Sequence, residues 1–317
     1  MKSGLKNLLF KLFLFLIPVC LFFIWIEYQA RQIPNSYIQK KKLIESQLDS
    51  IKVLVLESSN GYKDIDPAQF SCKGFNFSNS SQTLFYDTRL CMKYLDRLPQ
   101  LKGVIISFSY ISLYFELNET PDDWRDYFYF HYFDIRHPSL NLFDLKAFTY
   151  TALYSRIVIS EFIFHRFDIK KQIGDIQPTG WEKAPLPENP NIISDSVAFN
   201  RLKFHLTLTN QQNLFPNVRY LEELFSELRK RNIEVYLVTP PVSETYYKFI
   251  NPDLDKKNRR VMNDLCLKYN AEYFDYFKDS RFTKGDSYDN DHLNYIGAEK
   301  FSRILDQDIV SKICQHK

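Results

Sequence analysis

The chain has 317 residues, of which 45% are hydrophobic and 25% are charged. This balance suits a packed core with a solvated surface and excludes a disordered, collagen-like or multi-pass membrane chain. Five cysteines without a C-x-x-C pair exclude a disulfide-dense scaffold and a cysteine-based zinc ribbon. The net charge of +3 divides into +6 over residues 1–42 and −3 over the remainder. The body therefore lacks the basic surface of a nucleic-acid-binding protein, and we expect no such partner.

The N-terminus reads as a membrane anchor over residues 1–28. No charge interrupts Leu12–Ile26, and the apolar run extended back to Leu8 would span roughly 28 Å as a helix, close to the hydrocarbon thickness of a bilayer. Three lysines precede the run, which predicts a cytoplasmic N-terminus and an extracytoplasmic body on a single-pass inner-membrane protein. A cleaved signal peptide is the alternative. The bulky end of the run, with Trp25 and Tyr28 placed as interfacial aromatics, favours an uncleaved anchor.

The remainder predicts a polar helical stalk over residues 29–50 and one α/β domain over 51–317. Apolar runs typical of buried strands alternate with segments of helical periodicity, which indicates a parallel sheet covered on both faces. The strands are expected at 51–56, 104–108, 233–238 and 272–274, and the helices at 84–98, 218–228, 256–269 and 296–309. Residues 111–200 break this alternation and read as an insertion. In such sheets, ligands bind beyond the carboxyl ends of the strands.

Two polar segments carry the candidate chemistry. Ser58 and Ser59 follow the first strand, where a tight strand-to-helix turn exposes a hydroxyl and backbone N–H groups can stabilise an oxyanion. Before the last helix, Asp289 precedes His292 by three residues, a spacing that lets the carboxylate fold back onto Nδ1 and orient Nε2 as a base. Turn and capping roles are the plainer alternatives for both segments. Asp291, next to His292, is expected to point away from the imidazole and to cap the last helix or meet solvent.

A calcium site is a further alternative for the second segment. Asp286, Asp289 and Asp291 could supply carboxylate oxygens, which are the ligands that calcium prefers.

Together these segments resemble the SGNH (GDSL-type) hydrolase superfamily. L-E-S-S-N-G-Y-K-D-I-D-P (56–67) is similar to the first block of its membrane-anchored bacterial branch, which is related to alginate-type O-acetyltransferases. D-N-D-H-L-N-Y-I-G-A-E-K-F-S (289–302) is similar to the closing block of that branch. The resemblance implies a flavodoxin-like three-layer α/β/α fold. It also implies Ser59 as nucleophile, His292 as general base and Asp289 as the residue that orients it, with no cofactor and no metal.

The sequence departs from the family pattern at two places. Glu57 stands where the first block has a glycine, and a carboxylate there could block the oxyanion site or raise the pKa of the base. The Gly-x-Asn-Asp of the third block is replaced by Ser107–Tyr110. The oxyanion candidates are therefore the Ser59 backbone N–H and, as substitutes, Asn76 and Asn79, each of which could instead serve a turn.

Two hypotheses follow from different classes of protein. The favoured one is a serine esterase or O-acyltransferase that acts on a cell-envelope glycan with an acyl donor. The other is a non-catalytic envelope protein that keeps the fold and binds a glycan or a partner.

An aromatic run and a pair of cysteines are two further features of the chain. The aromatic run Tyr127–Phe133 suits an insertion helix better than a sugar-stacking or membrane surface. Cys72 and Cys91 could pair only if the fold brings them together.

Overall fold

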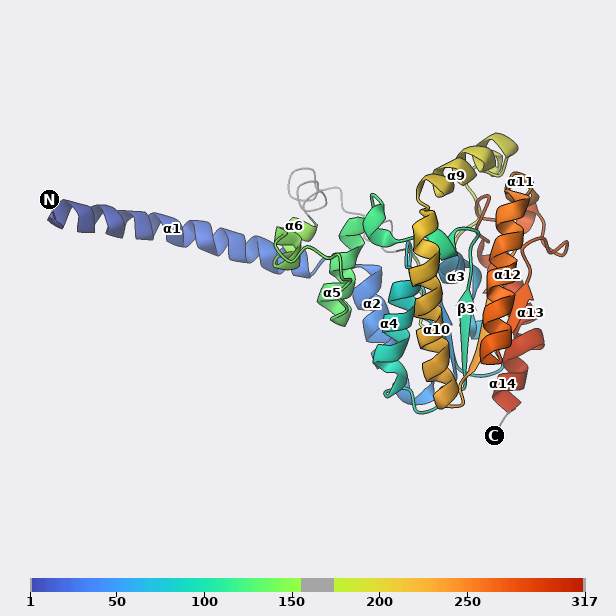
Figure 1. Ribbon diagram of the computed structural model, residues 1–317. Coiled ribbons are helices and arrows are strands. Elements are labelled where there is room, and N and C mark those ends of the chain that lie inside the picture. Colours follow the sequence, from blue (N-terminus) through green and yellow to red (C-terminus); the bar gives the residue numbers. More distant parts are fainter. Residues whose placement is uncertain (1, 155–173, 316–317) are drawn as a thin grey trace.

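The computed structural model describes residues 2–154 and 174–315 (Figure 1). Its first element is helix α1, Lys2–Arg31, which extends away from the rest of the molecule. The stretch Gly4–Arg31 is long and apolar enough to cross a membrane, and none of its most apolar window is buried inside the protein. The predicted apolar helix is thus present. Its orientation and cleavage stay predictions.

Five parallel strands form the sheet, in the order β2-β1-β3-β4-β5. This is the strand order of the flavodoxin-like doubly wound fold. The strands are β1 (Val53–Leu56), β2 (Gly74–Asn76), β3 (Gly103–Ser107), β4 (Glu234–Thr239) and β5 (Glu272–Asp275). The predicted α/β class with a parallel sheet is confirmed.

Helices cover both faces of this sheet, because alternate residues of a strand point to opposite sides. Leu54 and Leu56 of β1 belong to one hydrophobic cluster, whereas Val53 and Val55 belong to another. The first cluster lies under α4 (Leu84–Leu95), α10 (Leu214–Lys230) and α12 (Pro252–Tyr269). The second lies under α13 (Tyr295–Leu305) and α14 (Ser311–Gln315). The result is the predicted three-layer α/β/α sandwich (Figure 1).

The stalk is helical but is not a free spacer. Helix α2 (Ser36–Glu45) packs on α5 (Asp126–Phe133), with the rings of Tyr37 and Phe128 centred 4.8 Å apart. Lys40, in the middle of α2, is almost completely buried, and its ammonium group donates to the Asn76 carbonyl. This segment therefore packs against the body, although its sequence is polar.

The predicted insertion supplies several short helices between β3 and β4. They are α5, α6 (Tyr150–Leu153) and α9 (Asp195–Thr207), and residues 155–173 of the insertion lie outside the described part of the chain. The aromatic run is the helix α5, and five of its aromatic side chains are buried, as predicted for an insertion helix. Beyond β4 follows the single-turn helix α11 (Glu244–Tyr247).

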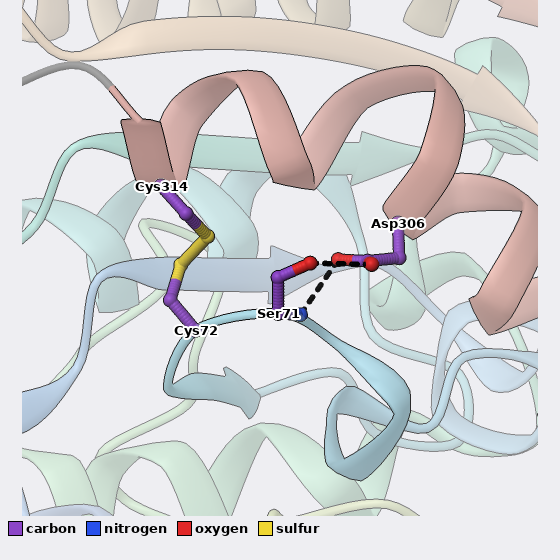
Figure 2. Close-up of a disulfide and its surroundings, with 4 residues drawn as sticks. All are labelled: Ser71, Cys72, Asp306 and Cys314. Carbon is purple, nitrogen blue, oxygen red and sulfur yellow. Dashed lines mark hydrogen bonds between the residues drawn. A yellow bond between two sulfur atoms is a disulfide. The ribbon is translucent and has the colours of Figure 1, made fainter.

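A disulfide joins Cys72 to Cys314 across 242 residues of sequence (Figure 2). It links the loop before β2 to α14, and beside it the Ser71 hydroxyl donates to the Asp306 carboxylate at 2.5 Å. Cys91, which the sequence left as a partner for Cys72, is instead a free thiol buried under the sheet. The crosslink ties the C-terminal helix to the edge of the sheet.

Candidate active site

Ser59 stands at the carboxyl end of the first strand. Strand β1 ends at Leu56, and helix α3 (Ser59–Asp64) begins two residues after Glu57. The intervening turn leaves Ser59 on the wall of a cavity of about 270 Å³. As the first residue of α3, Ser59 also offers a backbone N–H that the helix itself does not use.

The structure brings Ser59, His292 and Asp289 together. The Ser59 Oγ lies 2.8 Å from the His292 Nε2, although 233 residues separate them in the sequence. Both carboxylate oxygens of Asp289 lie 3.0 Å from the His292 Nδ1. A serine hydroxyl, an imidazole and a carboxylate in this order have the geometry of an acyl-transfer triad.

The loop that carries His292 is folded by its own side chains. Asp289 Oδ1 accepts hydrogen bonds from the backbone N–H groups of Asp291 and His292, which turns the carboxylate towards the imidazole. At the end of the loop, Asn294 is completely buried and caps α13 by accepting from the N–H groups of Ile296 and Gly297. Its amide also donates to two carbonyls of the loop. The L-N-x-x-G-A pattern is thus the structural support of His292.

Charged groups around His292 set its protonation. Burial lowers the pKa of the imidazole, but the carboxylates of Asp289 and Asp291, with a smaller effect of Asp64, outweigh burial and raise it to about 9. Burial alone would raise the pKa of Asp289. The opposing charge and hydrogen bond of His292, with the more distant Arg201, hold it well below its usual range. A charged pair is therefore the resting form, and the imidazole becomes a proton acceptor only as the pH rises.

Asp291 does not have the role that the sequence suggested. A position next to His292 predicted a solvated or helix-capping carboxylate, but the side chain is buried. Its Oδ1 accepts from Nε of Arg201 at 3.1 Å, and it lies 3.9 Å from the His292 Nδ1. Its Oδ2 lies 3.7 Å from Nε2 of His205. Asp289 is nevertheless the nearer carboxylate to His292, as the three-residue spacing predicted.

The carboxylate of Glu57 is held by donors of the turn that follows it. Its Oε2 accepts from the Gly61 N–H at 2.5 Å, and its Oε1 accepts from the Ser58 hydroxyl at 3.0 Å. Burial raises the pKa of Glu57, and these donors, the positive charge of His292 and the Ser109 N–H partly offset that rise. Glu57 thus braces the first turn of α3 while lining the cavity.

The two asparagines suggested as oxyanion donors serve the turns beneath the site. Asn76 is completely buried, and its amide nitrogen donates to the Gly61 and Ile65 carbonyls. Asn79 accepts from the Ser36 hydroxyl and the Ser80 N–H, and it is not among the residues that line the cavity. Asn76 is therefore committed to the fold, and the backbone N–H of Ser59 stays an oxyanion candidate.

The three carboxylates proposed for calcium, those of Asp286, Asp289 and Asp291, do not meet at one site. Asp286 accepts from the N–H of Thr283 and from Lys300, which holds it in a neighbouring turn. Of the described residues that could group around a metal ion, only Asp289, Asp291 and His292 come together, and they are already paired with one another and with Arg201.

Helix α9 provides a wall of the cavity that the sequence analysis missed. The cavity is lined from this helix and the residue after it by Arg201, Phe204, His205 and Leu208. His205 Nδ1 lies 2.8 Å from the Tyr246 hydroxyl, and burial lowers the pKa of this imidazole to about 4. The sequence gave little indication of α9, because only Ala198 and Leu202 of this helix are buried and its apolar face is weak.

Comparison with known proteins adds little to this geometry. A family model without a functional description matches residues 187–314, which is less than half of the chain. No curated protein matches the sequence. A protein from Streptococcus pneumonia, provisionally described as a platelet activating factor, is 13% identical over 92% of this chain and 97% of its own, with a TM-score of 0.41. A protein from Bacteroides fragilis NCTC 9343, provisionally described as an acylhydrolase, is 11% identical over 87% and 95%, with a TM-score of 0.40. Because both TM-scores lie below 0.5, neither likeness identifies the family or the activity of this chain.

Proposed function

We propose that the protein is a membrane-anchored serine esterase or O-acyltransferase of the SGNH type that acts on a cell-envelope glycan. The observation that carries this proposal is the hydrogen-bonded series Ser59–His292–Asp289, of which Ser59 lines the cavity. A serine is a poor nucleophile unless a base lies within hydrogen-bond reach, and the 2.8 Å contact meets that requirement.

The chemistry follows from the positions of the three side chains. The Ser59 Oγ attacks the carbonyl carbon of an ester, and its proton passes to the Nε2 of neutral His292. The resulting tetrahedral oxyanion faces the Ser59 N–H, which the helix leaves free for such a contact. When the ester C–O bond breaks, His292 returns the proton to the leaving alcohol, and the acyl group stays on Ser59. Water or a sugar hydroxyl then attacks the acyl carbon and gives its proton to His292. The bond between the Ser59 Oγ and the acyl group breaks, and His292 returns the proton to the Ser59 Oγ.

An extracytoplasmic position of the body is part of the proposal. Disulfides persist in oxidising compartments, and the Cys72–Cys314 bridge suits a body outside the cytoplasm. An alkaline phosphatase fused after residue 50 should therefore be active in cells. An inactive phosphatase together with a fluorescent cytoplasmic reporter at the same junction would refute this topology.

One observation favours a second candidate, a non-catalytic envelope protein that binds a glycan or a partner. The family has a glycine at the position of Glu57. Here the buried Glu57 carboxylate accepts the Gly61 N–H in the first turn of α3. Negative charge there opposes a developing oxyanion.

The purified full chain in detergent decides between the two. We expect p-nitrophenol release from short acyl esters, and Ser59→Ala should abolish it. Ser311→Ala, which also changes the first residue of a helix, should retain it. A strict transferase can leave soluble esters unhydrolysed. The intact mass of the protein, measured after incubation with an acyl donor, should therefore show an acyl group on Ser59. The absence of both turnover and an adduct would support the non-catalytic candidate.

A further inference from the structure

Exposed apolar side chains gather in one short turn of the insertion. Phe143, Leu145 and Phe148 are 96%, 70% and 64% exposed, and they are three of the five most exposed large apolar side chains outside α1 among the described residues. The segment Leu145–Ala147 is a 3₁₀ turn, in which side chains three residues apart eclipse one another. Leu145 and Phe148 therefore share a face, while Ala147 is buried on the other. We call residues 143–148 the apolar turn.

The apolar turn leads directly into a helix that is docked on α1. The carboxylate of Glu27 accepts from the backbone N–H groups of Tyr150 and Thr151, each at 3.0 Å, so that a residue of α1 holds the first turn of α6. Arg31 of α1 stacks over the Tyr150 ring at 4.8 Å. Figure 1 shows α6 against the C-terminal end of α1, on the side of the body from which α1 extends.

The position of Glu27 gives the depth of these contacts in a bilayer. Glu27 directly follows the charge-free run Leu12–Ile26, and a helical residue advances about 1.5 Å. The headgroup region on each side of the hydrocarbon is roughly 5–7 Å thick. Glu27 and the start of α6 would therefore lie at headgroup depth. No spacer intervenes, because Ala30 is already completely buried in the body.

We propose that the apolar turn is a second membrane contact, which inserts Phe143, Leu145 and Phe148 into the headgroup region of the bilayer that α1 crosses. This inference rests on the membrane anchoring in the proposed function. An exposed apolar group beside an anchor and at its interfacial depth loses contact with water when it meets lipid. Two contacts fix the tilt of α1 and its docked body relative to the bilayer, whereas a single spanning helix can tilt there.

The test uses the full chain in liposomes of phosphatidylcholine and phosphatidylglycerol. The exposed thiol Cys20 is first removed by Cys20→Ser, because Cys91 and Cys266 are buried and the remaining two cysteines are paired. A nitroxide is then attached at Phe143→Cys or Phe148→Cys. The control is Phe215→Cys on α10, where the native side chain is 72% exposed in a helix that packs on α4. Collisions with oxygen, which concentrates in lipid, are compared with those of a water-soluble nickel complex.

We expect an oxygen-to-nickel accessibility ratio several-fold higher at 143 and 148 than at 215. Equal ratios at the three positions, in a protein that resists carbonate extraction, would overturn the second contact and leave the anchor intact. Low accessibility to both reagents at 143 would mean that a second copy of the chain covers the turn, and would also overturn it. Release of the protein by carbonate would instead refute the anchoring itself, and with it this inference.

Discussion

Asp64 accepts a hydrogen bond from the backbone N–H of Leu293 at 2.8 Å, which ties the helix of Ser59 to the loop of His292. Asn60, on the same helix, donates to the Asp291 carbonyl at 2.5 Å. The two bonds flank His292 and hold it against the Ser59 hydroxyl. Burial is the main cause that raises the pKa of Asp64 well above its usual range.

Asp64 should therefore act as a positioning residue. Asp64→Leu removes the acceptor, and we expect a loss of at least about 10-fold in kcat with little change in KM, because small displacements of a base are costly. Asp64→Asn keeps an acceptor of the same shape and should stay within about threefold of the parent. Ester hydrolysis by the folded variants, checked by circular dichroism, measures both. Equal losses in the two variants would contradict a role through the Leu293 bond.

The pH dependence of the reaction should reflect His292. Its pKa of about 9 means that the imidazole is protonated at neutral pH and becomes a base as the pH rises. We expect kcat/KM to increase from pH 7 and to level off above about 9. A profile that is flat over this range would show that another group is the base.

Asp291 should contribute to that profile without being required for the reaction. Its carboxylate is one of the charges that raise the pKa of His292, so Asp291→Asn should move the rise of kcat/KM to lower pH. Asp264→Asn removes an exposed carboxylate on α12 and should leave the profile unchanged. An unshifted profile for Asp291→Asn would mean that Arg201 already cancels the charge of Asp291 at His292.

The Cys72–Cys314 bridge should matter for stability. It closes a loop of most of the chain, and loss of such a native disulfide costs about 2–5 kcal/mol. The free energy of unfolding of the double variant Cys72→Ser/Cys314→Ser, measured in urea, should fall by that amount. Cys20→Ser changes a free thiol in α1 and serves as the control. Matching curves for the two variants would show that the bridge does not constrain the unfolded chain.

Much of the sheet could be predicted from the sequence, because buried parallel strands are nearly continuous apolar runs. The strands predicted at 104–108 and 233–238 are β3 (Gly103–Ser107) and β4 (Glu234–Thr239). β2 was missed. It has only three residues, Gly74–Asn76, and its backbone pairing with β1 rather than any sequence pattern makes it a strand.

The site was predictable only where chemistry and local spacing coincide. Asp289 and His292 are three residues apart, and Ser59 follows a strand, which made all three candidates. Their roles came only from the family resemblance. Arg201 carries no such signal, because its contact with Asp291 spans 90 residues and exists only once α9 is placed. The role of Glu57 was equally hidden, since its partner Gly61 becomes a donor through the turn of α3.

A final prediction concerns the glycine of the closing block. A Cβ at Gly297 would lie 2.1 Å from the Asp286 carbonyl oxygen, far inside van der Waals contact, although the backbone there needs no positive φ. The same carbonyl accepts the Asn294 N–H at 3.0 Å, so a displaced Asp286 would loosen the cap that supports His292. Gly297→Ala should therefore lower the free energy of unfolding by about 2 kcal/mol or more and reduce ester hydrolysis.

Gly285→Ala is the matched control in the same loop. A Cβ at Gly285 would meet its nearest atom, the Thr283 hydroxyl oxygen, at 3.6 Å, which is ordinary contact. We expect its unfolding curve and its activity to resemble those of the parent. If both alanine variants unfolded alike, the close approach of Gly297 to Asp286 would not be what holds the loop. The support of His292 would then have to come from its other contacts, those of Asp289, Asp64 and Asn60.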